Sequence, residues 1–218
     1  MKIDVKGPVV PNAHKPVYDY YGIQCVCPAD VQASLDAANG EPVVVYINSG
    51  GGDVFAGAEI YTALMDYPGD VELQIVGLAA SAASVIAMAR RCVISPVGQI
   101  MVHNVSSAAE GDYRAMHHTG DVLDNANDAL ANAYMRKSGL PREKIRQMMD
   151  EETWLTAPAA LKAGLVDEIM GDRLVAAVET QTLPYPVIKK TLAQLQTEKA
   201  AALETARNNY KNLLEKEL

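Results

Sequence analysis

The sequence lacks any hydrophobic run long enough to cross a membrane. No apolar stretch approaches the roughly 20 residues that a transmembrane helix needs. No signal-peptide core follows the first six residues, Met1 to Lys6. These two absences predict a cytoplasmic protein that makes no contact with a membrane.

Cysteine is scarce, and its spacing matches no redox or zinc motif. Cys25 and Cys27 are separated by one residue, and the third cysteine is Cys92. An odd number without a CxxC pair predicts free thiols in a reducing compartment. The four histidines include no HExxH pair. We therefore predict neither a metal nor another cofactor.

Basic residues are also few. The 19 lysines and arginines are outnumbered by 27 acidic residues, which gives a net charge of −8 and argues against nucleic acid as a partner. No lysine occurs between Lys15 and Lys137. This gap weakens two hypotheses, an enzyme that binds the phosphates of coenzyme A and a peptidase with a Ser–Lys pair.

What the sequence does contain is a regular alternation of strand-like and helix-like segments. The run at 42–48 is almost continuously β-branched, as in a strand buried on both faces. Further strands are expected at 1–6, 22–27, 71–76, 92–95, 99–103 and 154–156, and helices at 28–38, 53–66, 81–90, 112–138, from Pro141 onward and at 157–163. The alternation predicts an α/β protein with a largely parallel sheet.

The composition changes near residue 183. Two prolines make the segment 183–186 a stiff linker, and residues 187–218 are rich in Ala, Leu, Glu and Lys. We predict one domain over residues 1–183 and a linker with a helical tail over 184–218. The tail is interpreted either as a helix that docks on a partner or as a solvated extension.

Ser81 is the candidate nucleophile. It follows the expected strand 71–76 and lies among small residues, in the segment GLAASAAS at 77–84. A hydroxyl on a turn between a strand and a small-residue helix is presented without crowding. Ser84, in the same segment, is interpreted as a small residue that allows close packing.

Other residues supply the remaining parts of a hydrolytic site. His103 ends an apolar strand 22 residues downstream and is the candidate base. One of the acids at 150–152 is the candidate that orients the histidine. The glycines at 50–52 expose backbone for an oxyanion hole, and the N–H of Ala82 is its second natural donor. A phosphate-binding role for these glycines is weak, because neither GxGxxG nor Gly-Lys-Ser/Thr is present.

Over about residues 15 to 170 the chain resembles the proteolytic subunit of the Clp protease, and most closely its phage-type relatives, the head maturation (prohead) proteases. The motifs that carry the resemblance are YINSGGG at 46–52, GLAAS at 77–81, IMVHN at 100–104, WLTAPAA at 154–160 and GLVD at 164–167. Three residues depart from the family pattern. Gly50 replaces a proline, Ala82 a methionine and Glu152 an aspartate.

The resemblance implies a fold and a set of site residues. The fold would be a spiral of ββα units shared with crotonases, followed here by the helical tail. The catalytic residues would be Ser81, His103 and Glu152, with Asp150 as the alternative acid. The oxyanion donors would be Gly52 and Ala82.

The resemblance also implies partners. The substrates would be polypeptides, and the chain would form homo-oligomeric rings with the helix 112–138 at the ring–ring interface. An AAA+ unfoldase and a capsid or scaffold protein are further partners implied by different family members. The function predicted is thus a serine endopeptidase that processes phage capsid or scaffold proteins.

Two other functions stay open. A crotonase-like enzyme acting on acyl-CoA thioesters would share the fold and an oxyanion hole without needing a Ser–His pair. A non-catalytic assembly protein would keep the fold as a structural component. The presence of both Ser81 and His103 favours the peptidase.

Overall fold

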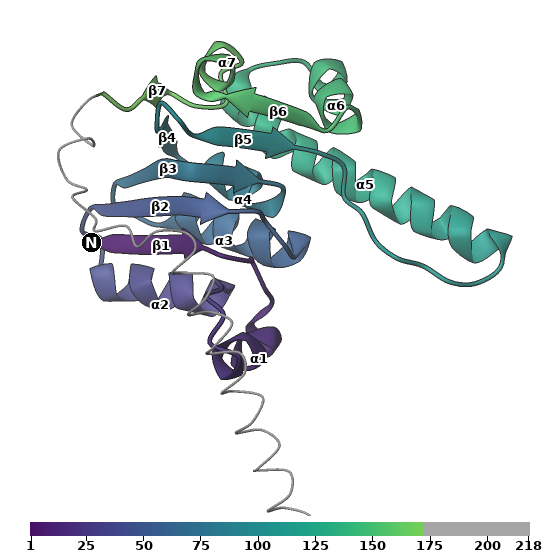
Figure 1. The fold of residues 1–218 in the computed structure, drawn as a ribbon, viewed down its shortest axis with the longest axis horizontal. Helices are drawn as coiled ribbons and strands as arrows, with labels where there is room; N and C mark the ends of the chain where they lie inside the picture. The colour runs from purple at the N-terminus through teal and green to yellow at the C-terminus, as the bar shows by residue number, and fades with distance from the viewer. Residues whose placement is uncertain (172–218) are drawn as a thin grey trace, which may run out of the picture. The chain divides into compact units, whose positions relative to one another are not determined.

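The computed structural model describes residues 1–171, which form one α/β unit around a seven-stranded sheet (Figure 1). The domain boundary predicted at 183, the linker 183–186 and the helical tail lie outside the described residues. No helix within residues 1–171 combines the length and hydropathy needed to cross a membrane.

The bounds of the elements are as follows. The strands are β1 (Lys2–Lys6), β2 (Val43–Ser49), β3 (Val71–Ala80), β4 (Arg91–Ile94), β5 (Gln99–Val102), β6 (Thr153–Thr156) and β7 (Glu168–Ile169). The helices are the 3-10 turn η1 (Asn12–His14), α1 (Lys15–Tyr20), α2 (Pro28–Ala38), α3 (Val54–Asp66), α4 (Ala82–Ala87), α5 (Tyr113–Ser138), α6 (Arg142–Asp150) and α7 (Ala157–Lys162).

The sheet is largely parallel, as predicted, and it divides at β3. One path runs β1-β2-β3-β4-β7, with every pair parallel. The first part of β3 pairs with β4, whereas its last residues, Leu78 to Ala80, pair with β5. β6 then pairs with β5 in antiparallel register. The carboxyl end of β3 therefore lies where its partner strand changes, a place where open α/β sheets commonly bind ligands.

The core forms because the β-branched strands and the small-residue helix are buried together. In β2 the side chains of Val45 and Ile47 are fully buried, and all six residues of α4 are buried. Gly57 of α3 brings that helix close to Ala82, where an added Cβ would lie 3.0 Å from the Ala82 side chain. Small residues thus let α3 and α4 approach each other just behind the end of β3.

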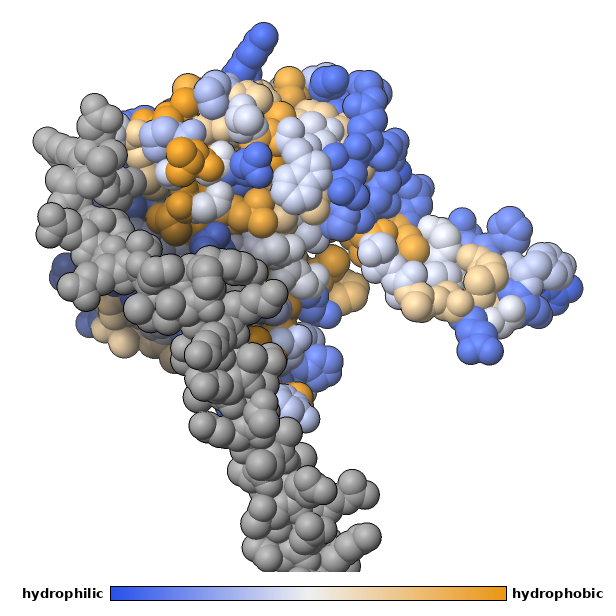
Figure 2. All heavy atoms as spheres, viewed as in Figure 1, coloured by the Kyte–Doolittle hydropathy of each residue, from blue (hydrophilic) through white to orange (hydrophobic). Residues whose placement is uncertain are grey.

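Helix α5 projects beyond the sheet (Figure 1). It contains 26 residues, with Asp112 capping its first turn and Gly139 ending it in the left-handed conformation. Its buried residues all lie in its C-terminal half, beginning at Asn127. Figure 2 shows that the projecting part carries both hydrophobic and hydrophilic residues. The N-terminal half of this helix therefore has no fully buried side chain within the described chain.

Three local predictions need correction. The segment 22–27 is not a strand, since its only strand-like contact is an isolated bridge between Val26 and Val9. Helix α1 forms at 15–20, where the sequence pattern predicts no helix, and Pro16 lies in its first turn, where a proline is tolerated. β3 is longer and α4 shorter than predicted, because pairing with β5 extends the strand up to Ala80.

Candidate active site

Ser81 lies at the turn between β3 and α4, in a backbone conformation that few non-glycine residues adopt. Its φ and ψ are 55° and −126°. Such a conformation costs roughly 1–3 kcal/mol and persists only where the surroundings impose it. Here the Ser81 N–H donates to the Met101 carbonyl at 3.0 Å, which holds the turn against β5. The strain is thus stored at the residue that the sequence picked out as nucleophile.

His103 lies next to Ser81 in space. It directly follows β5, and the parallel pairing of Ala80 with Met101 brings the ends of the two strands together. The distance from His103 Nε2 to Ser81 Oγ is 2.8 Å, and both side chains are half-buried. A hydroxyl and an imidazole at this distance can exchange a proton.

The predicted acids lie near this pair without touching it. The β5–β6 ladder pairs Val102 with Thr153, so His103 and Glu152 follow as opposing residues just past its end. Glu152 has a φ of 47° and is exposed, and its Oε1 accepts from the Trp154 indole N–H at 3.3 Å.

No hydrogen bond within residues 1–171 joins His103 to Glu152 or to Asp150. The Asp150 carboxylate instead accepts from the side-chain amide of Asn104 at 2.7 Å. The choice between Glu152 and Asp150 stays a prediction.

The glycine turn after β2 packs directly against Ser81. Gly51 has a φ of 90°, and a Cβ there would lie 2.7 Å from the Ser81 Cβ and 2.6 Å from the Ala80 carbonyl oxygen. Gly52 has a φ of 150°, and its Cβ would lie 2.1 Å from the Val9 carbonyl oxygen. Glycine is required at both positions because the backbone of neighbouring segments fills the side-chain space.

The two predicted oxyanion donors share a geometric feature. The Gly51 carbonyl accepts from the Val9 N–H at 2.9 Å, so the Gly52 N–H of the same planar peptide points away from Val9. The Ser81 carbonyl accepts from the Ser84 N–H at 2.9 Å, so the Ala82 N–H points away from α4. Neither N–H donates to another group within residues 1–171. Both are therefore available to a ligand.

A residue outside the predicted site holds the glycine turn. Ser49 is buried at the end of β2, where its hydroxyl donates to the Gly7 carbonyl at 2.6 Å and accepts from the Gly51 N–H at 3.0 Å. Its place inside the YINSGGG motif was the only sequence signal. Ser84, interpreted from the sequence as a small packing residue, has its hydroxyl 2.7 Å from that of Tyr134.

A cavity of about 330 Å³ adjoins the site at Gly52. Its walls come from the start of α3, the segment after His103 and the middle of α5, and include Phe55, Val105, Val122 and Leu123. Its predominantly apolar lining suits a hydrophobic side chain.

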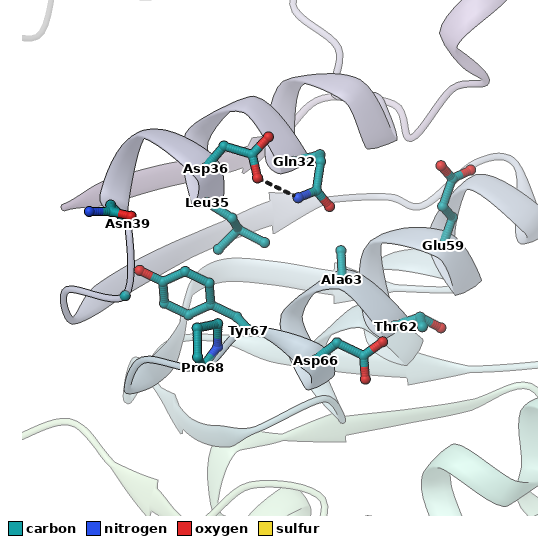
Figure 3. A pocket seen from close by; sticks show the side chains of 11 residues that line it. Gln32, Leu35, Asp36, Asn39, Glu59, Thr62, Ala63, Asp66, Tyr67 and Pro68 are labelled. Atoms are coloured by element: carbon teal, nitrogen blue, oxygen red, sulfur yellow. Dashed lines mark hydrogen bonds between the residues drawn. The ribbon is translucent and has the colours of Figure 1, made fainter.

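A larger cavity of about 620 Å³ lies between α2 and α3 (Figure 3). Its lining includes Asp36, Glu59 and Asp66 and contains no serine, histidine or cysteine. It therefore offers neither a Ser–His nor a Cys–His pair.

Within residues 1–171, neither a cysteine nucleophile nor a metal site has support. Burial raises the pKa of the Cys25, Cys27 and Cys92 thiols, in the last case to about 12. A raised pKa keeps a thiol protonated at neutral pH, so none of the three is an activated nucleophile. In this part of the chain, no group of three or more His, Cys, Asp or Glu side chains is arranged to hold a metal ion.

The fold and the site together define an α/β protein with a Ser–His pair on a strained turn between a strand and a helix, beside exposed glycine backbone. The model of the Clp protease family matches residues 31–173, more than half of the chain. The chain belongs to the Clp protease family.

Curated relatives agree with this assignment. The chain is 31% identical over 141 residues to the ATP-dependent Clp protease proteolytic subunit of Porphyromonas gingivalis, a match that covers 62% of this chain and 63% of the relative. It is also 31% identical over 141 residues to the corresponding subunit of Deinococcus radiodurans, covering 62% of this chain and 69% of that relative. The match to the first of these thus spans less than two thirds of its length.

A solved structure supports the fold. A ClpP1 mutant from Listeria monocytogenes superposes with a TM-score of 0.65 at 19% identity, covering 79% of this chain and 92% of that structure. At this level of identity the comparison establishes the α/β fold alone.

Proposed function

We propose that the chain is a serine-type endopeptidase whose nucleophile is Ser81. The observation that carries the proposal is the 2.8 Å contact between Ser81 Oγ and His103 Nε2 at a strained turn. The Clp protease family assignment supports the same class of chemistry.

The first half of the reaction would form an acyl-enzyme. Ser81 Oγ attacks the carbonyl carbon of the scissile peptide while its proton passes to His103 Nε2. The tetrahedral intermediate collapses by breaking the C–N bond, and His103 returns the proton to the leaving amine. An ester between Ser81 and the acyl part of the substrate remains.

The second half would use water as the nucleophile. Water attacks the ester carbonyl and gives a proton to His103, which then protonates the departing Ser81 oxygen. In both halves the negative oxygen of the intermediate lies between the N–H groups of Gly52 and Ala82. Neither group has another acceptor within residues 1–171, so both can donate as the charge develops.

Glu152 is our candidate for orienting His103. The β5–β6 register supports it over Asp150, because it faces His103 at the end of the ladder while Asp150 is bonded to Asn104.

The corresponding prediction compares Glu152→Gln with Asp150→Asn. We expect Glu152→Gln to lower kcat by roughly 10²-fold or more, since a misoriented histidine slows both proton transfers. Asp150→Asn should change kcat by less than about threefold. Steady-state hydrolysis of a fluorogenic peptide measures both variants. A larger loss for Asp150→Asn would transfer the role to that residue.

We propose polypeptides as substrates and a homo-oligomer as the working form. The apolar cavity beside Gly52 supports binding of a hydrophobic substrate side chain. The projecting half of α5 supports self-association, since Tyr113 and Val122 on it are 68% and 51% exposed. The ring–ring interface and an AAA+ unfoldase partner rest on the resemblance and on the names of the relatives, which are subunits of ATP-dependent proteases.

The narrower role in processing phage capsid or scaffold proteins rests only on the motifs of the phage-type branch. The curated relatives named above are proteolytic subunits of ATP-dependent Clp proteases and lend it no support. The Ser81–His103 contact also argues against the two alternative functions, a crotonase-like acyl-CoA enzyme and a non-catalytic assembly protein.

A fluorophosphonate probe tests the proposal. The probe phosphonylates an activated serine: the Ser81 Oγ–P bond forms, the P–F bond breaks, the proton passes to His103 and fluoride leaves. We expect mass spectrometry to find the adduct on the peptide that contains Ser81 and to find none in Ser81→Ala. An acyl-CoA enzyme or an assembly protein would remain unlabelled, and labelling at another serine would refute the assignment.

A further inference from the structure

A chain of buried hydroxyls connects α5 to the nucleophile turn. The Ser84 hydroxyl lies 2.6 Å from the carbonyl oxygen of Ser81 and 2.7 Å from the Tyr134 hydroxyl. Ser84 is fully buried, and Tyr134 is 2% exposed. Residues 50 positions apart in the sequence thus meet directly behind Ser81.

The direction of the two hydrogen bonds follows from their chemistry. A carbonyl oxygen only accepts, so the single proton of the Ser84 hydroxyl points to the Ser81 carbonyl. Tyr134 must then donate to Ser84. Burial raises the pKa of Tyr134 to about 12, so its hydroxyl remains protonated over the working range of a peptidase. The order is Tyr134 to Ser84 to the Ser81 carbonyl.

The Ser81 carbonyl belongs to the same peptide group as the Ala82 N–H. Because that group is planar and trans, its C=O and N–H point in opposite directions. Anchoring the carbonyl on the inside of the turn therefore aims the N–H outward. Donation to the carbonyl also polarises the peptide, which makes its N–H a stronger donor.

We propose that Tyr134 and Ser84 are positioning residues that aim and strengthen the Ala82 N–H as an oxyanion donor. The inference rests on the proposed function, since it concerns the same nucleophile turn. Neither side chain touches the substrate, and their effect is transmitted through one peptide group. The contribution is partial, because the backbone N–H groups of Ser84 and Val85 also donate to the Ser81 carbonyl, at 2.9 and 3.3 Å.

The informative variant is Tyr134→Phe, which removes one hydroxyl and keeps the ring. Ser84 retains its acceptor, so no buried donor is left unpaired. Tyr67→Phe is the matched control, since Tyr67 is 6% exposed and donates to the Glu41 carbonyl at 2.7 Å without contact to the nucleophile turn. Ser84→Ala is less informative, because it strands the Tyr134 hydroxyl in the core.

The test is the rate of inactivation of the full chain by a fluorophosphonate, resolved into KI and kinact. In the transition state of phosphonylation, negative charge develops on the phosphoryl oxygen, which would occupy the same position as the negative oxygen of the peptide intermediate. We expect Tyr134→Phe to lower kinact by about three- to tenfold, a fraction of the roughly 10²–10³-fold cost of losing a whole oxyanion donor. KI and Tm should stay within the range of Tyr67→Phe.

The remaining outcomes overturn one proposal or the other. A kinact for Tyr134→Phe equal to that of Tyr67→Phe would refute the positioning role. A lower kinact accompanied by a Tm loss beyond that of Tyr67→Phe would also refute it, because the effect would then be structural. Labelling that persists at the wild-type rate in Ser81→Ala would instead refute the proposed nucleophile.

Discussion

Alanine at His103 is expected to abolish peptide hydrolysis as completely as alanine at Ser81, with the double variant losing no more. The reason is that the two groups act as a unit. Without the imidazole, the Ser81 hydroxyl keeps its proton and is a poor nucleophile, and without the hydroxyl the imidazole has nothing to activate. We expect each single variant to lower kcat by about 10⁵–10⁶-fold.

Steady-state hydrolysis of a fluorogenic peptide by the two single variants and the double variant measures this prediction. His14→Ala and Ser34→Ala are matched controls. His14 is exposed in η1, and among residues 1–171 the Ser34 hydroxyl bonds only to the Asp30 carbonyl of its own helix. Both should retain wild-type rates. A His103→Ala variant within about tenfold of wild type would mean that another group accepts the Ser81 proton.

The parts of the fold that the sequence predicted well are those whose causes are local. The strand β2 follows from a β-branched run, and α5 ends at a glycine that adopts the left-handed conformation, with a φ of 72°. By contrast, β7 has two residues and exists through its pairing with β4. The extension of β3 to Ala80 depends on β5 in the same way. Such pairings leave no periodic signal in the sequence.

In the candidate active site, too, features with local causes could be predicted and features that depend on long-range packing could not. Ser81 and His103 can be proposed from the sequence because their motifs are local, and the 2.8 Å distance between them follows from the β3–β5 pairing. The roles of Ser84 and Tyr134 could not be predicted, because a hydroxyl–hydroxyl contact between α4 and α5 depends on how those helices pack. The small size of Ser84 suggested only close packing.

Alanine at Gly51 is expected to damage both the fold and the reaction. Its φ of 90° disfavours a side chain, and the new Cβ would lie 2.7 Å from the Ser81 Cβ and 2.9 Å from the Ala82 nitrogen. The conformational strain and the overpacking should together lower the free energy of unfolding by about 2–5 kcal/mol. Relief of the clash would move either the nucleophile or an oxyanion donor, so kinact should fall by roughly 10²-fold or more.

Gly50→Ala is the control. It tests whether the losses of unfolding free energy and of kinact are specific to Gly51 or follow any alanine substitution in the glycine turn. Gly50 has no positive φ, and no atom of the described residues lies within 4 Å of the Cβ it would gain. We expect its unfolding free energy and kinact to stay near wild type. Urea unfolding and fluorophosphonate kinetics, at a temperature where both variants are folded, measure the difference. If Gly51→Ala matched Gly50→Ala in both unfolding free energy and kinact, the glycine turn could not pack as closely against Ser81 as the structure shows. An oxyanion hole built from Gly52 and Ala82 would then lose its geometric basis.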